Sequence, residues 1–332
     1  MKKCNFMRFW GIIALLQISL SVNAEEVDYS VISVGEESGT EFTKITNDGD
    51  CVCMPEVKRS RFGTGLSWYT NRIIDISSDG NKLGFLSQRN QTSNIFIKDL
   101  NSKGGSIQRT NRQYVLDFSF SPDGKYICFS EKDGRVNTIY QTSAEKGYVC
   151  RQFTSGNKDY APVYSFNMEN VFFARQEKNG ASIWSYNIAD NYLSNYTIGM
   201  NPYPLKNTNK MLCIRMNNGE RGEIWMVDID SGTEECILAD PNHSFSTPSL
   251  SPNGEWILCV GSSVIEREKK RGYANTDIFV CKIDGTNLHQ LTYHAADDLS
   301  PVWSKDGKSI YFISQRGSSN ATANVWKMNF TL

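Results

Sequence analysis

A polar turn followed by a short apolar strand recurs along the chain. Four copies of the turn contain Asp-Gly or Asn-Gly, which supply the positive φ angles that tight hairpin turns need. Two further copies have lost the glycine but keep the apolar strand. The complete turns lie at 78–80, 121–124, 251–254 and 304–307, and the altered ones lie at 166–170 and 207–209. This alternation predicts a succession of β-hairpins.

One aromatic residue occupies a fixed place in a later strand of each copy. The six aromatics are separated by 44, 44, 41, 54 and 47 residues, a spacing typical of one four-stranded blade of a β-propeller. They are Phe96, Tyr140, Trp184, Trp225, Phe279 and Trp326. We expect these side chains to contribute to the core of the blades and to have no functional role.

A short closing strand ends five of the six copies but is missing from the last one. The five closing strands lie at 107–110, 150–154, 193–197, 235–238 and 288–292. A matching segment, Phe-Thr-Lys-Ile-Thr at 42–46, stands near the N-terminus instead. If this segment completes the last blade, no sheet is left with an open edge. The sequence therefore predicts an all-β fold, a six-bladed β-propeller of four-stranded antiparallel blades whose ring is closed by an N-terminal strand in the last blade.

The limits of the blades follow from these three recurrent signals. We expect a single propeller domain over 25–332, because helical periodicity is absent after the first segment of the chain. Residues 48–70 form a connector that has no counterpart in the repeats. The predicted blades cover 71–113, 114–157, 158–199, 200–243, 244–296, and 297–332 together with 40–47.

Residues 1–24 have the features of a signal peptide. Three basic residues precede the apolar run 10–16, and small residues up to Ala24 fit a cleavage site after that residue. The apolar run is shorter than the roughly 20 residues that a membrane span needs. We therefore expect a periplasmic or secreted protein without stable membrane insertion after cleavage.

Charge and cysteine content narrow the classes of partner. The chain has 35 Lys and Arg against 36 Asp and Glu, and this balance does not indicate a surface that binds nucleic acid. Eight cysteines follow the signal segment, and six of them lie in apolar strand patterns, where a thiol acts as a small hydrophobe. Their even number also permits disulfides in an exported protein. We expect a monomer.

Candidate ligand-binding residues follow from aligning the repeats on their turns. In a propeller, the loops that enter the innermost strands share one face around the central channel, and loops on such a rigid scaffold often bind ligands. Convergent oxygen atoms suit calcium, so a cation site is one interpretation. The other is that polar residues line a wet channel mouth without any cofactor. The alignment places Asn71, Asp159, Asn201 and Asp298 at this mouth, with Val115 and Phe245 at the two remaining positions.

Two further features are predicted on the same face. The longest insertion, 262–275 in the fifth blade, is a mixed-charge segment that we expect to form a loop in contact with a protein partner, with a merely solvated loop as the alternative. His243 and His294 lie in loops that enter innermost strands. Together with Asp298 they could hold a metal in a lyase-type site, although a histidine in such a loop is more often plain surface.

Two stretches of the repeat point to a known family. Asp-Phe-Ser-Phe-Ser-Pro-Asp-Gly-Lys at 117–125 and Leu-Ser-Pro-Val-Trp-Ser-Lys-Asp-Gly-Lys at 299–308 resemble the WD-like repeat of TolB-type propellers. The resemblance covers nearly all of the chain after the signal segment and implies a periplasmic protein whose propeller binds other envelope proteins. The α/β domain that precedes the propeller in TolB has no counterpart in this sequence. Similar repeats occur in propeller domains of prolyl-oligopeptidase-like enzymes and of some polysaccharide lyases.

Two functions from different classes follow. The first is a noncatalytic scaffold that binds an envelope protein or peptide, which is favoured because the sequence has no Gly-x-Ser-x-Gly motif and no hydrolase segment after the last blade. The second is a carbohydrate-active enzyme similar to propeller polysaccharide lyases, with a metal-assisted site at the central funnel.

Overall fold

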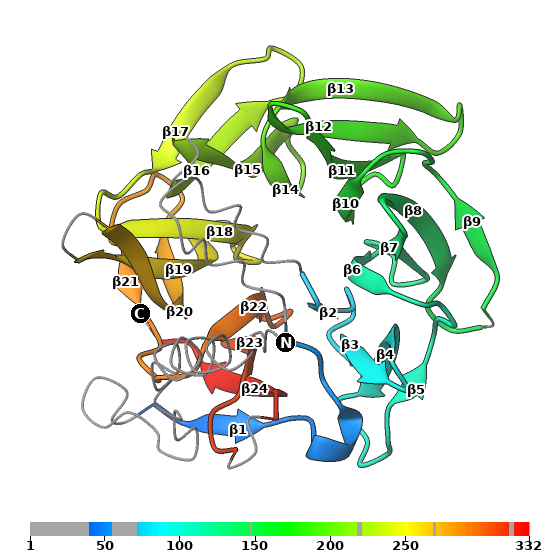
Figure 1. The fold of residues 1–332 in the computed structure, drawn as a ribbon, viewed down its shortest axis with the longest axis horizontal. Coiled ribbons are helices and arrows are strands. Elements are labelled where there is room, and N and C mark those ends of the chain that lie inside the picture. Colours follow the sequence, from blue (N-terminus) through cyan, green and yellow to red (C-terminus); the bar gives the residue numbers. More distant parts are fainter. Residues whose placement is uncertain are drawn as a thin grey trace, which may run out of the picture.

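The computed structural model describes residues 40–54, 72–146, 148–217, 221–267, 270–318 and 322–331. Its strands form six four-stranded sheets arranged in a ring (Figure 1). Neighbouring strands within each sheet run antiparallel, and the strands nearest the axis of the ring are β2, β6, β10, β14, β18 and β22. Each sheet is therefore one blade of a β-propeller.

The blades are numbered in chain order, and each is given from its innermost strand outward. Blade 1 is β2 (Ile74–Ile76), β3 (Lys82–Arg89), β4 (Thr92–Asp99) and β5 (Ile107–Gln108); blade 2 is β6 (Val115–Phe120), β7 (Tyr126–Asp133), β8 (Val136–Ser143) and β9 (Cys150–Gln152); blade 3 is β10 (Asp159–Tyr164), β11 (Asn170–Glu177), β12 (Gly180–Asn187) and β13 (Tyr192–Ile198); blade 4 is β14 (Met200–Pro204), β15 (Lys210–Asn217), β16 (Arg221–Asp228) and β17 (Glu234–Leu238); blade 5 is β18 (His243–Leu250), β19 (Trp256–Arg267), β20 (Lys270–Lys282) and β21 (His289–Gln290); blade 6 is β22 (Asp298–Trp303), β23 (Ser309–Ser314), β24 (Asn324–Asn329) and β1 (Phe42–Lys44).

The predicted six-bladed propeller and its closure by an N-terminal strand are confirmed. The described residues contain no α-helix and a single short 3₁₀ helix, η1 (Asp48–Asp50). None of the helices in this part of the chain is long and apolar enough to cross a membrane. The predicted blade limits need one adjustment, because His243 begins β18 of blade 5 and does not end blade 4.

In five of the six blades, all but blade 4, the recurrent polar turn joins the two innermost strands by one hydrogen-bonding pattern. In blade 1, Ser77 Oγ donates to Asp79 Oδ1 (2.5 Å) and accepts from the backbone N–H of Lys82 (2.9 Å). Gly80 closes the turn with a φ of 78°, which an L-residue adopts only at a cost. In blade 3 the non-glycine Met168 takes a φ of 61° at this place, so the turn persists although its glycine is lost. The same serine contacts recur at Ser121, Ser165, Ser251 and Ser304.

Ring closure depends on β1, which pairs with β24 as the fourth strand of blade 6. Phe42 stands opposite Met328 and Lys44 stands opposite Trp326 in this antiparallel ladder. The backbone N–H of Ile45 continues the pairing beyond the strand. Figure 1 shows β1 (blue) outside β24 (red), so the beginning and the end of the described chain form one sheet.

A buried threonine fixes the outer strand to its neighbour in four blades. In blade 6, Thr46 Oγ1 accepts from the backbone N–H of Val325 (2.8 Å) and donates to Asn324 Oδ1 (3.0 Å). This contact explains why the predicted closing strands tend to end in threonine. The equivalent acceptors in blades 1, 2 and 5 are Thr110, Thr154 and Thr292, which take the N–H groups of Ile95, Ile139 and Ile278.

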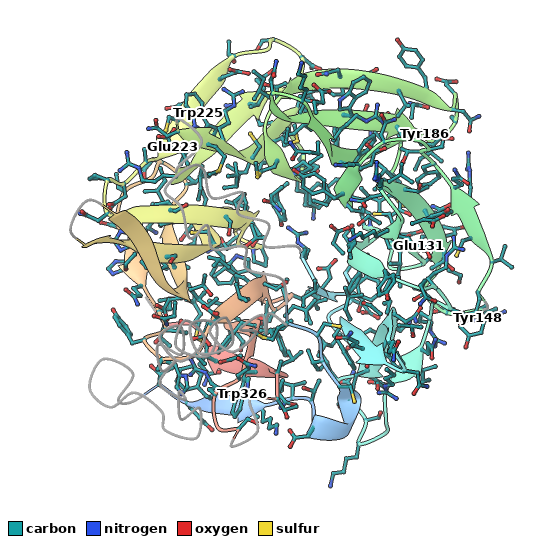
Figure 2. All side chains as sticks on the ribbon, in the orientation of Figure 1. Glu131, Tyr148, Tyr186, Glu223, Trp225 and Trp326 are labelled. Carbon is teal, nitrogen blue, oxygen red and sulfur yellow. The ribbon has the colours of Figure 1, made fainter. Side chains whose placement is uncertain are left out.

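The six recurrent aromatics all lie on the third strand of their blade. Phe96, Phe279 and Trp326 are buried, whereas the other three are partly exposed. Trp225 lies beside Glu223, whose carboxylate accepts the indole N–H at 3.1 Å (Figure 2). Four of the rings are covered by guanidinium groups, which adds a cation–π contact to apolar packing. These pairs are Arg89 with Phe96 (4.3 Å to the ring centre), Arg112 with Tyr140 (4.2 Å), Arg175 with Trp184 (4.4 Å) and Arg215 with Trp225 (4.7 Å).

The first residues of the predicted connector lie against blade 1. Val52 pairs with Ser87 of β3, and the N–H of Cys53 donates to Leu86 O at 2.9 Å. The chain thus adds a short antiparallel contact to β3 beyond the point that β2 reaches. The rest of the connector, 55–70, and the predicted signal peptide, 1–24, lie outside the described residues.

The eight cysteines after the predicted signal peptide are all free thiols. Four of them, Cys128, Cys213, Cys259 and Cys281, are fully buried within strands. Burial raises the pKa of Cys128, Cys213 and Cys281 to about 12. These thiols stay protonated at neutral pH and pack as small apolar groups, as their strand pattern predicts.

We expect Thr46→Val to lower the free energy of unfolding by about 1–3 kcal/mol, because it leaves the buried N–H of Val325 without an acceptor. Urea unfolding followed by circular dichroism measures the change. Thr43→Val, at an exposed position of β1 three residues earlier, is the matched control and should stay within about 0.5 kcal/mol of the wild type. Equal losses in the two variants would contradict a specific role for the Thr46 hydroxyl.

Candidate functional site

The residues that the sequence alignment places at the channel mouth are largely buried. Asp159 and Asp298 are the first residues of β10 and β22, and neither is exposed to solvent. Asn71 lies outside the described residues. The remaining candidates, Val115, Asn201 and Phe245, are also buried.

The two predicted carboxylates each pair with an arginine of the same blade. Asp159 accepts two hydrogen bonds from Arg175 on β11, at 2.7 and 3.0 Å. Asp298 accepts from Arg316, which follows β23, at 2.5 Å. Arg316 is itself fully buried, and its guanidinium covers the ring of Phe42 in the closing strand at 4.0 Å. Each carboxylate is thus an internal counter-charge for a guanidinium.

These ion pairs bear on the predicted calcium site. A cation at Asp159 or Asp298 would have to compete with a buried guanidinium for the same oxygens. Within the part of the chain that the structure describes, no three His, Cys, Asp or Glu side chains gather in a way that could hold a metal ion. Calcium binding stays a prediction.

A residue with left-handed backbone followed by proline interrupts four of the innermost strands. At each of these places the register of the strand shifts relative to its neighbour. A positive φ is unfavourable for non-glycine residues, and most of all for a β-branched one such as Thr247. Backbone strain of this kind persists only where the surroundings enforce it, and it is common at functional sites. The four residues are Ala161 (φ 52°), Asn201 (49°), Thr247 (47°) and Ser300 (53°).

This pattern corrects the predicted alignment in blade 4. Asn201 occupies the place of Ala161, because the register shift begins directly at both residues. The blade 4 counterpart of Asp159 is therefore Gly199, and Asn201 lies two residues further along the strand. The alignment slipped because the turn at 207–209 has lost the glycine that sets the register in other blades.

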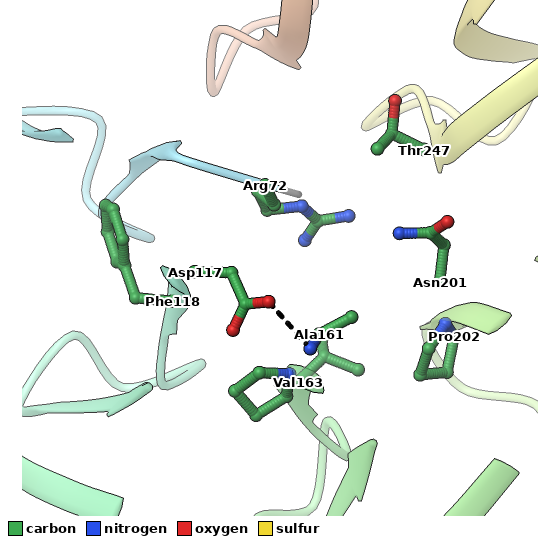
Figure 3. A pocket seen from close by; sticks show the side chains of 9 residues that line it. Arg72, Asp117, Phe118, Ala161, Val163, Asn201, Pro202 and Thr247 are labelled. Atoms are coloured by element: carbon green, nitrogen blue, oxygen red, sulfur yellow. Dashed lines mark hydrogen bonds between the residues drawn. The ribbon is translucent and has the colours of Figure 1, made fainter. Parts of the chain in front are cut away.

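A small pocket, open to solvent, lies among these interrupted strands. It draws residues from the innermost strands of blades 2 to 5, and Arg72 reaches it from just before β2 of blade 1. Figure 3 shows the Arg72 side chain extending into the space between Asp117 and Asn201. The lining residues are Arg72, Asp117, Phe118, Ala161, Pro162, Val163, Asn201, Pro202 and Thr247.

Two carboxylates beside the pocket connect neighbouring blades. Asp117 Oδ2 accepts the N–H of Ala161 in blade 3 at 2.9 Å, and its other oxygen accepts the hydroxyl of Ser130. Asp75 Oδ2 accepts the N–H of Phe120 in blade 2 at 2.8 Å. Burial raises the pKa of Asp117 to about 6, because desolvation outweighs these hydrogen bonds and the positive charge of Arg72. Burial raises the pKa of Asp75 for the same reason.

The two predicted histidines have separate surroundings. His243 Nδ1 lies 3.4 Å from Asp240 Oδ1, and its ring packs against Phe279. His294 is fully buried, and its Nδ1 accepts the N–H of Ala296 at 2.9 Å. Among the described residues these histidines and Asp298 do not form a group of metal ligands.

The described residues of the insertion at 262–275 extend β19 and β20 as paired strands, which corrects the predicted loop. β19 and β20 pair from Trp256 and Lys282 as far as Arg267 and Lys270. Two strands that are already paired can lengthen without the entropy cost of closing a new loop. The added backbone hydrogen bonds therefore favour a longer hairpin over the solvated loop that the charged residues suggest. Its contact with a partner protein stays a prediction.

Sequence reasoning missed Arg72, Asp117 and Thr247. A signal for the pocket was available in blades 5 and 6. There, a proline follows the residue that stands seven places before the turn glycine, and this residue is Thr247 in blade 5. The alignment used the residue nine places before the turn glycine, where the buried ion pairs begin. No repeat-based signal marks Arg72, because it precedes the first strand of blade 1.

Comparison with known proteins gives one family and several similar folds. A family model described as the TolB beta propeller domain matches residues 69–254, more than half of the chain. Among solved structures, a TolB of Agrobacterium tumefaciens is similar with a TM-score of 0.58 and 16% identity over 79% of this chain and 90% of that one.

Two further structures have comparable scores. TolB from Acinetobacter baumannii has a TM-score of 0.56 and 20% identity over 70% of this chain, which spans 56% of that protein. An oligogalacturonate lyase from Vibrio parahaemolyticus has a TM-score of 0.58 and 10% identity over 91% of this chain and 96% of that one. At these identities the likeness shows a shared fold.

The raised pKa of Asp117 predicts a pH-dependent stability. The folded-state pKa of Asp117 is about 6, above its ordinary value of 3.8. The free energy of unfolding should therefore fall as the pH rises from 3.8 to 6, and the full loss should remain at higher pH. We expect Asp117→Asn to gain free energy of unfolding relative to the wild type at pH 7, by at most about 3 kcal/mol, and this gain to vanish near pH 4. Urea unfolding at the two pH values measures it.

The exposed Asp133→Asn in the same blade is the control for removal of one negative charge. It should show no comparable change of the gain with pH. A gain of Asp117→Asn that is the same at both pH values would contradict the raised pKa.

Proposed function

The chain belongs to the TolB β-propeller family, and we propose that it is an exported, noncatalytic propeller that binds a protein or peptide in the cell envelope. The pocket around Arg72 is the proposed binding site. The observation that carries the proposal is the convergence of five blades on this pocket. Ligand pockets combine apolar walls with a few polar groups that fix orientation. Here prolines and Val163 supply walls, and Arg72, Asn201 and Thr247 supply polar groups.

A binding role is supported by the state of the acids on the innermost strands, of which Asp117 lines the pocket. Asp117, Asp159 and Asp298 each accept hydrogen bonds from partners within the protein. A catalytic carboxylate has to reach a substrate proton or a reacting atom. Groups that connect strands and blades instead keep the walls of a binding pocket rigid.

Export and location rest on the predicted signal peptide at 1–24. A protein released after cleavage at Ala24 would act in the periplasm or outside the cell, as a monomer. The near-zero net charge supports a protein or peptide partner rather than a nucleic acid. The extended hairpin of β19 and β20 adds a second surface that a folded partner could contact.

Selection from a random peptide library on the immobilised protein tests the proposal. We expect enriched peptides that bind the wild type and lose at least about tenfold in affinity on Thr247→Trp, because the indole fills the pocket. Asn201→Trp is the second blocking variant. Lys125→Trp, at an exposed turn on the other end of the innermost strands, is the control and should bind like the wild type.

Circular dichroism and thermal unfolding establish that the variants are folded. Peptides that bind the two blocked variants as well as the wild type, or no enrichment at all, would overturn the pocket as a peptide site. Incubation with polygalacturonate tests the enzymatic alternative, and release of unsaturated oligosaccharides would replace the noncatalytic function.

A further inference from the structure

The guanidinium of Arg72 has no acidic or carbonyl partner among the residues that the structure describes. Arg72 is half-buried and lines the pocket. Among the described residues its side chain makes no hydrogen bond or ion pair, and its guanidinium only covers the ring of Tyr203 at 5.3 Å. Stacking on an aromatic ring orients the planar group while its N–H donors stay available.

This state sets Arg72 apart from the other arginines. Every other arginine that the structure describes as buried or half-buried has a hydrogen-bond or ion-pair partner, as Arg175 has in Asp159 and Arg316 has in Asp298. Arg89, Arg109, Arg215 and Arg221 donate in the same way, and Arg112 forms an ion pair with Glu131 (Nε to Oε2, 3.2 Å). A half-buried guanidinium with five unused donors is costly unless a ligand or water supplies acceptors.

The carboxylates nearest to Arg72 do not fill this need. Asp117 and Asp75 are close enough for the charge of Arg72 to lower their pKa, against the larger raising effect of burial. Neither forms an ion pair with it, because their oxygens accept backbone and hydroxyl groups of the blades. The guanidinium therefore points past them into the pocket (Figure 3).

Two more polar residues face the same space. Asn201 approaches from the side opposite to Arg72 (Figure 3). Thr247 is 4% exposed, and its hydroxyl has no hydrogen-bond partner within the described part of the chain. A buried hydroxyl without a partner is rare in proteins and calls for a ligand or an ordered water.

We propose, building on the peptide-binding function above, that the pocket binds a carboxylate group of the peptide, an Asp or Glu side chain or a C-terminus, with Arg72 as its main partner. The forked guanidinium donates two parallel hydrogen bonds to a carboxylate, which is the strongest neutralising contact that arginine makes. Asn201 and Thr247 supply further donors at the rim of that contact.

A cationic ligand fits the pocket less well. It would have to lie next to the positive charge of Arg72, and the nearby carboxylate oxygens already accept hydrogen bonds from the blades. The negative charge of Asp117 repels a bound carboxylate and attracts a bound cation. Removal of this charge therefore distinguishes the two kinds of ligand. Asp117→Asn should bind the carboxylate ligand at least as tightly as the wild type, whereas it should bind a cation more weakly.

The test is a double-mutant cycle on the peptides selected by the wild-type protein. Each peptide is made with its carboxylates replaced one at a time by amides, including the C-terminus. We expect the replacement of one particular carboxylate by an amide to weaken the affinity of the peptide for the wild-type protein by about tenfold to a hundredfold. The same replacement should change the affinity of the peptide for Arg72→Gln very little. Arg72→Lys keeps the charge without the fork and should lie between the two.

Arg135→Gln is the matched control, since Arg135 is exposed in the turn between β7 and β8 and the variant removes the same charge. It should reproduce the wild-type pattern. If Arg72→Gln does not fold, Arg72→Lys and the amide peptides still give the coupling.

The outcomes separate this proposal from the proposed function. Peptides that bind in the pocket without any carboxylate coupled to Arg72, or that bind Asp117→Asn more weakly, overturn the carboxylate and leave peptide binding intact. If no peptide is selected, tri-galacturonate is the probe. Binding to the wild type that is lost in Arg72→Gln then supports the carboxylate site and assigns it to an acidic sugar, and no binding of either probe overturns the site.

Discussion

The pairing of β1 with β24 is the constraint on which the rest of the structure depends. A propeller has one place where the ring must be sealed, and an open edge there would leave unpaired backbone groups and a free strand. Here the seal combines a short ladder, the buried hydroxyl of Thr46 and the ring of Phe42, which packs edge-on against Phe312. Arg316 covers the same phenylalanine and pairs with Asp298, so the closing strand is tied to the innermost strand of its blade.

Closure also determines what can meet at the axis. Arg72 lies just before β2, the first strand of blade 1. Asn201 and Thr247 belong to blades 4 and 5. These residues line one pocket because the six sheets are held in a ring. Repeated positions build the blades, and the pocket arises where repeated strands carry unlike side chains at equivalent places.

The fold could be predicted because its signals are local and repeated. A turn that needs positive φ, an aromatic on the third strand and a threonine that ends the fourth recur with the length of a blade. The missing sixth copy of the closing strand, found again at 42–46, was enough to predict ring closure. Each signal reflects one hydrogen-bonding or packing requirement that every blade has to meet.

The site was harder to predict because its determinants are neither local nor repeated. Asp159 and Asp298 carry carboxylates of the kind that bind cations, but each of them pairs with an arginine. These arginines stand 16 and 18 residues later in the sequence, so a local pattern does not reveal the pairs. Asn201 was placed two positions out of register because the turn of blade 4 had drifted. That Arg72 has no ion-pair partner in the described part of the chain depends on which blades surround it in three dimensions, and no local pattern of residues reports this. If the Arg72 guanidinium receives the ligand, a crystal structure of the protein with a selected peptide should have a peptide carboxylate within hydrogen-bonding distance of Arg72. A peptide bound elsewhere, with only solvent beside Arg72, would rule out this role.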